Sequence, residues 1–193
     1  HLDRLAAANF AGLHTVPLAR ARAGMRLMAA QLGGSQPVAD VRERVIATDA
    51  GDLAVRIYNP DPSTVLPVTV YFHGGGFVLG DPGTHDALAR DLANASGTVV
   101  VSVDYPLAPE HKYPAAPDAA FAATCWVAEH GAEIGVDGSR LAVAGDSAGG
   151  NLAAVVALRA RERGEPNLAF QLLIYPDVDF RRTNESIRHF AGK

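Results

Sequence analysis

Apolar residues follow two different periods along the chain, and the changes between them divide it into strands and helices. Short β-rich runs occupy 44–48 and 53–58, and continuous apolar runs occupy 68–72, 98–103, 141–144 and 168–175. Such continuous runs are typical of strands that are buried on both faces. Helical periodicity covers 84–95, 116–130 and 151–163. Because strands and helices alternate from residue 68 onward, we predict an α/β fold with a mostly parallel central sheet and helices on both faces.

The first forty residues are alanine-rich and helical in pattern. Pro17 suits the first turn of a helix, and Gly33-Gly34 suits its end. Apolar residues recur at spacings of three and four, at Leu18, Ala21, Met25, Met28 and Leu32. We expect a surface helix that docks through this stripe. We therefore divide the chain into an N-terminal helical segment, 1–40, and a core, 41–193.

The stretch Gly145-Asp146-Ser147-Ala148-Gly149-Gly150 lies between a predicted strand and a predicted helix. A strand that turns into a helix within two residues, with serine at the apex, is the nucleophile elbow of G-x-S-x-G hydrolases. Strand and helix then pass so close that flanking positions such as Gly145 and Gly149 must lack side chains. The pattern predicts Ser147 as a nucleophile. A glycine-rich turn with an incidental serine remains the alternative.

A second glycine-rich stretch, His73-Gly74-Gly75-Gly76, directly follows the apolar run 68–72. A dinucleotide-binding loop would need its third glycine where Leu79 stands, and a phosphate-binding P-loop would need a lysine. The remaining functional interpretation is a loop whose bare amides approach a developing oxyanion. A purely structural tight turn stays open beside it.

Composition narrows the possible partners. The 193 residues are 48% apolar and 20% charged, which suits one hydrophobic core. The net charge of −4 carries no basic block, so we expect no nucleic-acid partner. No apolar run reaches the roughly 20 residues of a membrane span, and no signal peptide is evident, so we expect a cytoplasmic protein without stable membrane insertion. The single Cys125 can form no internal disulfide and fits a reducing compartment.

Metal binding is not indicated either. His14, His85, His111 and His130 fall in no spacing that is typical of metal ligands. We expect structural roles for these histidines and no metal or organic cofactor.

Four motifs together resemble the hormone-sensitive-lipase-like family of α/β-hydrolases, a group of esterases and lipases. They are His73 to Gly76, Asp104-Tyr105-x-Leu107-Ala108-Pro109-Glu110, Gly145 to Gly150, and Leu173-Ile174-Tyr175-Pro176. The order and spacing are those of the family, although Pro106 stands where the family commonly carries arginine. The resemblance implies an α/β-hydrolase fold in which segment 1–40 is a cap over an acyl-binding pocket.

The resemblance also implies roles for individual residues. Ser147 would attack the carbonyl of a small-molecule ester with a short or medium acyl chain. The backbone amides of Gly75, Gly76 and Ala148 would form the oxyanion hole. The other residues that carry the two glycine-rich motifs are His73, Gly74, Gly145, Asp146 and Gly149. A homodimer is an assembly known in the family.

The triad acid and histidine are expected beyond Lys193, because the family carries both on later strands of the fold. We therefore expect the chain to lack the last strands. Asp177, Asp179 and His189 follow Ser147 in the right order, but the resemblance places the triad residues further on, and no strand follows His189 to anchor it. Two alternatives to an enzyme remain: a ligand-binding, receptor-like protein on the same fold, and an inactive fragment.

Overall fold

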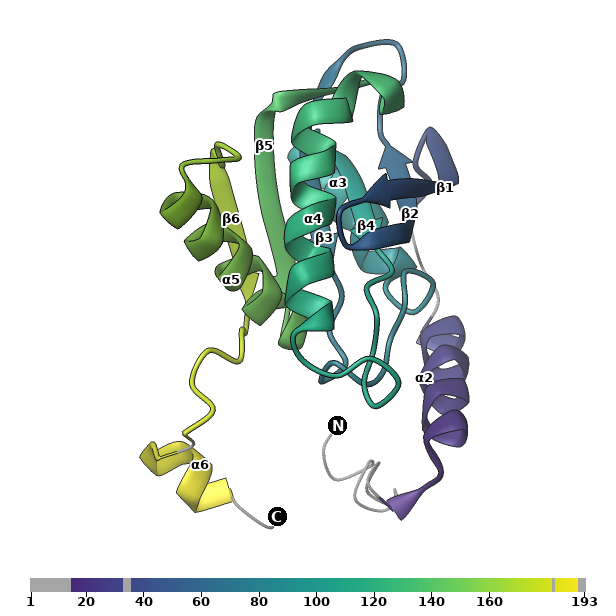
Figure 1. The fold of residues 1–193 in the computed structure, drawn as a ribbon. Coiled ribbons are helices and arrows are strands. Elements are labelled where there is room, and N and C mark those ends of the chain that lie inside the picture. Colours follow the sequence, from purple (N-terminus) through teal and green to yellow (C-terminus); the bar gives the residue numbers. More distant parts are fainter. Residues whose placement is uncertain (1–14, 33–35, 182, 191–193) are drawn as a thin grey trace.

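The computed structural model describes residues 15–32, 36–181 and 183–190, and a six-stranded sheet forms the centre of this part of the chain (Figure 1). The strands are β1 (Asp40–Thr48), β2 (Gly51–Asn59), β3 (Leu66–Phe72), β4 (Val99–Val103), β5 (Val136–Asp146) and β6 (Phe170–Ile174). Their order across the sheet is β1-β2-β4-β3-β5-β6. The predicted α/β fold is confirmed.

The strands from β3 onward are parallel. β3 pairs in parallel with β4 and β5, and β5 pairs in parallel with β6, whereas β1 and β2 form an antiparallel hairpin that joins β4. Parallel strands have their carboxyl ends at one edge of the sheet. The glycine loop after β3, the loop after β4 and the turn after β5 therefore meet at that edge.

Helices cover both faces of the sheet. α4 (Ala115–His130) and α5 (Ala148–Arg163) lie in front of it in Figure 1, and α3 (Asp86–Ser96) lies behind it. Neighbouring residues of one strand belong to different cores: Val70 packs with residues of α4 and α5, whereas Tyr71 packs with residues of α3. Successive strand residues point to opposite faces. The continuous apolar runs in the sequence follow from this two-sided burial.

Two strands differ from the prediction. β5 begins at Val136, whereas the prediction began it at residue 141. The first residues of β5 pair with Leu66 and Pro67 but form no apolar run, so the sequence pattern did not reveal them. β6 was predicted as a buried strand, and this is wrong. Its residues are exposed or half-buried, and Phe170 keeps 64% of its surface exposed, because β6 lies at the edge of the described sheet.

The N-terminal helix α2 (Leu18–Leu32) docks through charge as well as through apolar surface. Only part of the predicted stripe is covered: Ala21 is buried, but Met28 remains 47% exposed. Arg22 instead donates to the carbonyl oxygens of Val78 (2.9 Å) and Ala108 (3.0 Å) and pairs with Glu110. Periodicity reveals an apolar face but does not reveal what covers it. Residues 1–14 of the predicted cap lie outside the described residues.

The remaining described elements are short. A 3₁₀ turn, η2 (Gly131–Ile134), precedes β5, and α6 (Glu185–Phe190) follows β6. In the described part of the chain, no helix is both long and apolar enough to cross a bilayer.

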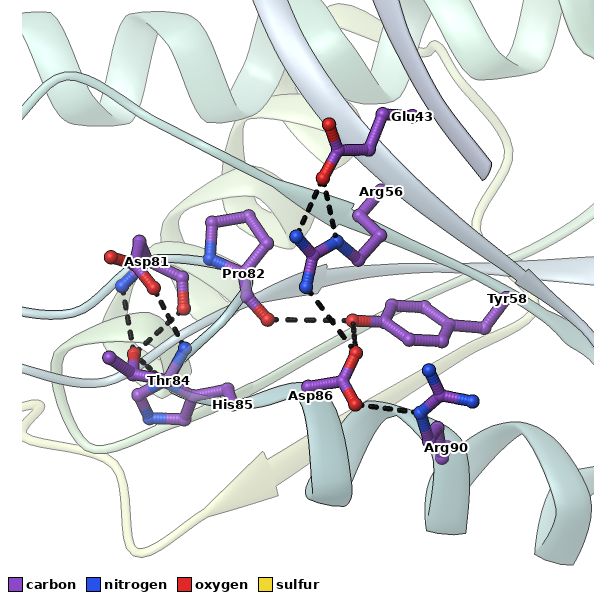
Figure 2. Close-up of polar contacts among 9 residues, drawn as sticks. All are labelled: Glu43, Arg56, Tyr58, Asp81, Pro82, Thr84, His85, Asp86 and Arg90. Atoms are coloured by element: carbon purple, nitrogen blue, oxygen red, sulfur yellow. Dashed lines mark hydrogen bonds and ion pairs between the residues drawn. The ribbon is translucent and has the colours of Figure 1, made fainter. Parts of the chain in front are cut away.

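A polar cluster behind the sheet joins the hairpin to the start of α3 (Figure 2). The carboxylate of Asp86 accepts a hydrogen bond from the buried Tyr58 hydroxyl (2.9 Å) and another from Arg90 Nε (2.6 Å). Arg56 bridges Asp86 to Glu43 on β1. Burial and the Asp86 carboxylate raise the pKa of Tyr58, so its hydroxyl remains a donor. The cluster fixes where α3 begins relative to β1 and β2.

We expect Tyr58→Phe to lower the free energy of unfolding by about 2 kcal/mol, because it removes a buried hydrogen bond to a charged group. Urea denaturation would measure the change. Tyr113→Phe is the matched control: Tyr113 is 85% exposed, and its replacement should stay within about 0.5 kcal/mol of the wild type. Equal effects of the two substitutions would contradict a role for the cluster.

Candidate active site

Ser147 occupies the turn between β5 and α5 with a strained backbone. Its φ of 52° and ψ of −117° lie where residues with a side chain are rare. The backbone is held on both sides, since the Ser147 N–H donates to Ile174 (2.9 Å) and its carbonyl accepts from Asn151 (3.1 Å). The side chain is half-buried. The sheet and the helix thus hold a serine hydroxyl at the carboxyl edge of the sheet.

The glycines that flank Ser147 permit a close crossing of backbones. A Cβ on Gly149 would overlap the carbonyl oxygen of Phe72 and lie 2.6 Å from that of His73. A Cβ on Gly145 would overlap the backbone of Gly149. No neighbouring side chain could move to relieve these overlaps, because the obstacles are backbone atoms. The need for glycine at both positions agrees with the sequence prediction.

The glycine loop after β3 holds its carbonyls and leaves two amides free. The Gly74 carbonyl accepts from His73 Nδ1 at 2.8 Å, and the Gly75 carbonyl accepts from the amides of Val78 (3.2 Å) and Leu79 (2.9 Å). Within the described residues, the N–H groups of Gly75 and Gly76 donate to nothing. A carbonyl and the following N–H share one rigid peptide plane and point opposite ways. Fixing the two carbonyls therefore fixes the direction of the two free donors.

A third free donor lies at the start of α5. Ala148 is the first residue of the helix, and the first N–H groups of a helix have no partner within it. The glycine loop and the turn touch directly, since the Gly74 N–H donates to Asp146 at 2.9 Å. Gly75 is half-buried and Gly76 is exposed, so solvent reaches the loop beside the turn.

Two buried titratable groups lie beneath this loop. Burial alone would raise the pKa of Asp146, but the nearby His85 and the hydrogen bond from Tyr71 outweigh burial and lower it. Burial lowers the pKa of His73 to about 4. The carboxylate is thus charged and the imidazole neutral at neutral pH. The uncharged His73 ring stacks on Tyr105 with 4.3 Å between ring centroids.

Backbone strain is concentrated around the turn. In the described part of the chain, the residues other than glycine with positive φ are Phe77 (63°), Ser147 (52°) and Tyr175 (34°). Phe77 belongs to the glycine loop, and Tyr175 directly follows β6. Strain of this kind is characteristic of functional sites and costs about 1–3 kcal/mol per residue.

The alternative triad residues have other surroundings. Both carboxylate oxygens of Asp179 accept hydrogen bonds from Arg181 at 2.8 Å. His189 lies exposed on α6. The amide of Asp177 donates to the Ser147 carbonyl at 3.3 Å, which is a backbone contact. In the described ranges, no side chain hydrogen-bonds to the Ser147 hydroxyl.

Two hollows of the described surface lie away from Ser147. One, of about 580 Å³, lies between α5 and β6, and the other, of about 910 Å³, lies between the β1–β2 turn and α4. Neither is lined by Ser147 or by the glycine loop. Across residues 15–32, 36–181 and 183–190, no three side chains of types that bind metals come together.

Sequence reasoning missed the residues that support the loop from below. Tyr71 and His85 contact the Asp146 carboxylate, and the Tyr105 hydroxyl donates to the His73 carbonyl at 2.6 Å. Tyr71 lies in an apolar strand run, and His85 has no motif around it. Tyr105 belongs to the motif from Asp104 to Glu110, but only the fold brings that motif beside β3.

The chain matches the family described as alpha/beta hydrolase fold over residues 69–193. It belongs to this family. Similar proteins include the esterase LipI of Mycobacterium tuberculosis, 54% identical over 145 residues that make up 74% of this chain and 45% of LipI. An ethyl acetate hydrolase of Pseudomonas putida is 39% identical over 150 residues, 75% of this chain and 46% of its own length. The chain spans about half the length of these curated relatives.

Solved structures give the same picture. A thermostable esterase from Pseudomonas putida superposes with a TM-score of 0.95 at 46% identity, over 98% of this chain and 60% of that protein. A hyperthermophilic esterase from Pyrobaculum calidifontis gives a TM-score of 0.84 at 47% identity, over 91% of this chain and 56% of its own. The predicted resemblance to α/β-hydrolase esterases is confirmed.

We expect Gly149→Ala to cost about 3 kcal/mol or more of folding free energy, because its Cβ would meet fixed backbone atoms. Gly24→Ala is the control, since a Cβ at Gly24 in α2 would find no atom within 4 Å. Denaturation midpoints would compare them. A Gly149→Ala variant as stable as Gly24→Ala would contradict the close crossing.

The buried His73 predicts a loss of stability in mild acid. Its pKa is about 4 when folded and 6.5 ordinarily, so between these pH values the unfolded chain binds a proton that the folded protein does not. The free energy of unfolding should therefore fall as pH drops from 6.5 toward 4, by on the order of 2 kcal/mol between pH 6.5 and 5, and level off below 4.

Urea denaturation of the wild type and of His73→Asn at pH 7 and pH 5 would measure this contribution. The variant should lose less stability than the wild type over that interval. Equal losses would show that His73 is not the source of the acid sensitivity.

Proposed function

We propose that the protein is a carboxylic ester hydrolase in which Ser147 is the nucleophile. The observation that carries the proposal is the contact between the strained serine turn and a loop in which the Gly74 and Gly75 carbonyls are held while the N–H groups of Gly75 and Gly76 are free among the described residues. Donors fixed before reaction stabilise an oxyanion without reorganisation, and each is worth about 10²–10³-fold in rate. Relatives named as esterases support the same reaction.

The proposed reaction proceeds through an acyl-enzyme. The Ser147 hydroxyl oxygen bonds to the ester carbonyl carbon and gives its proton to a general base. The carbonyl oxygen, now negative, accepts hydrogen bonds from the amides of Gly75, Gly76 and Ala148. The alcohol leaves with a proton from the base, and water then releases the acid by the same steps. No metal or organic cofactor enters this reaction.

We place the general base and its carboxylate partner outside the described residues. Asp179 is engaged with Arg181, and His189 lies exposed on α6. The solved esterases extend well beyond the region that this chain matches, which leaves room for both groups. The chain described here contributes the nucleophile and the oxyanion donors.

We infer a substrate with a short or medium acyl chain. Proteins similar to this one include an ethyl acetate hydrolase of Pseudomonas putida and an acetyl esterase of Salmonella paratyphi B. Segment 1–40 is proposed as a cap beside the acyl-binding pocket, supported by the Arg22 contacts of α2 to the loops after β3 and β4. We also propose that the protein is cytoplasmic, which its single cysteine, Cys125, supports. We further propose that it assembles as a homodimer.

Labelling of the full-length protein with a fluorophosphonate probe tests the nucleophile. Peptide mapping should place the label on Ser147, and Ser147→Ala should remove it and lower turnover of a p-nitrophenyl ester by about 10⁶-fold. Asp179→Asn and His189→Asn should label as the wild type does, because neither residue has a part in the proposed reaction.

Three other results of the labelling experiment would change the proposed roles of these residues. A label on another residue would overturn the role of Ser147. Loss of labelling in His189→Asn would make His189 the base. A protein that binds the ester without labelling or turnover would support the receptor-like alternative.

A further inference from the structure

The Asp146 side chain holds the glycine loop, although the residue itself belongs to the serine turn. Only 5% of Asp146 is exposed. One carboxylate oxygen accepts from the Gly74 amide (2.9 Å) and from the Tyr71 hydroxyl (2.5 Å). The other oxygen lies 3.5 Å from the Tyr175 hydroxyl and 3.6 Å from His85 Nε2. A buried charge with this many partners has a defined position.

The peptide unit between His73 and Gly74 is held at both of its polar ends. Its N–H donates to Asp146, and its carbonyl accepts from the Tyr105 hydroxyl at 2.6 Å. Because the unit is planar, two opposed hydrogen bonds fix its rotation. Tyr105 follows β4 and Asp146 ends β5, so the two strands beside β3 set the orientation of this unit.

The next peptide unit carries the proposed oxyanion donor. The units 73–74 and 74–75 meet at the Gly74 Cα, and glycine offers little steric resistance to rotation there. The unit 74–75 therefore keeps its orientation only while its own carbonyl is held by His73 Nδ1 at 2.8 Å and the unit before it is held by Asp146. Gly74 cannot be a larger residue, because a Cβ would overlap the Asp146 carboxylate. The close approach of Asp146 to Gly74 therefore holds the loop and also requires glycine there, so no side chain at residue 74 restricts the backbone.

We propose that Asp146 is a positioning residue, whose carboxylate aims the Gly75 N–H at the oxyanion by holding the Gly74 amide. The inference rests on the proposed esterase function. Asp146 does not touch the substrate; it acts through the loop. The Asp146 carboxylate is held in turn by Tyr71 on β3, by Tyr175 after β6 and by His85. The His85 ring is itself oriented before α3, where its Nδ1 forms a hydrogen bond with Thr84 Oγ1 at 2.9 Å (Figure 2).

Steady-state kinetics of the full-length protein test the proposal. Asp146→Ala should lower kcat by about 10²-fold, the loss expected of a misplaced oxyanion donor, and change KM by less than about threefold. Asp146→Asn keeps an acceptor for the Gly74 amide and should restore kcat to within about tenfold of the wild type. Asp137→Ala, at the opposite end of β5, is the matched control and should leave both constants unchanged.

A kcat within about threefold of the wild type in folded Asp146→Ala would overturn the proposal, and so would equal losses in Asp146→Ala and Asp146→Asn. If Asp146→Ala does not fold, Tyr105→Phe decides. It frees the other end of the same peptide unit and should lower kcat by about tenfold, and an unchanged kcat would overturn the proposal.

Amide hydrogen exchange at Gly74, followed by NMR, separates this inference from the esterase assignment. Protection of the Gly74 amide should fall by at least about tenfold in Asp146→Ala, whatever the activity. An inactive wild type with this loss of protection would refute only the esterase function. An active wild type whose Gly74 protection survives in Asp146→Ala would refute only the role of Asp146.

Discussion

The contact between the end of β3 and the start of α5 governs the rest of the structure. The Phe72 carbonyl oxygen lies where a side chain on Gly149 would begin, so strand and helix touch backbone to backbone. Interiors are close-packed, and a contact between fixed backbones leaves no room for adjustment. It brings the glycine loop that follows Phe72 to the turn that carries Ser147. The remaining features of the site are consequences of that proximity.

Beside the serine turn, the carbonyls of the glycine loop accept hydrogen bonds, while two of its amides are free among the described residues. The carbonyls of His73, Gly74 and Gly75 each accept a hydrogen bond, from Tyr105, His73 and the amides of Val78 and Leu79. Each bond directs an N–H on the far side of a peptide plane. In the part of the chain that the structure describes, the N–H groups of Gly75 and Gly76 stay unpaired, whereas that of Gly74 donates to Asp146. Free donors that are held in this way suit the proposed role in binding an oxyanion.

Charge organises the surroundings of the loop as well. Arg22 of α2 joins the loop after β3 to the loop after β4, and Arg26 pairs with Asp81. Beneath the loop, Asp146 is charged whereas His73 is neutral, because hydrogen bonds stabilise the carboxylate and burial destabilises the imidazolium. The loop is therefore supported from the N-terminal helix on one side and from the buried cluster on the other.

Local sequence was sufficient to predict most of the strands and helices. Continuous apolar runs predicted strands buried on both faces, and glycines around Ser147 predicted a close crossing, because both follow from local geometry. The edge position of β6 and the exposure of Met28 were not predictable, since a pattern shows which face is apolar but not what covers it.

By itself, the sequence determined the alternation of strands and helices, the mostly parallel sheet, the serine turn and the glycine loop. Only the tertiary structure decided that Asp146 reaches Gly74, that Tyr105 reaches His73 and that Arg22 reaches Val78. These contacts join residues that are far apart in sequence. Their partners are chosen by the packing of strands and helices, which no local pattern encodes.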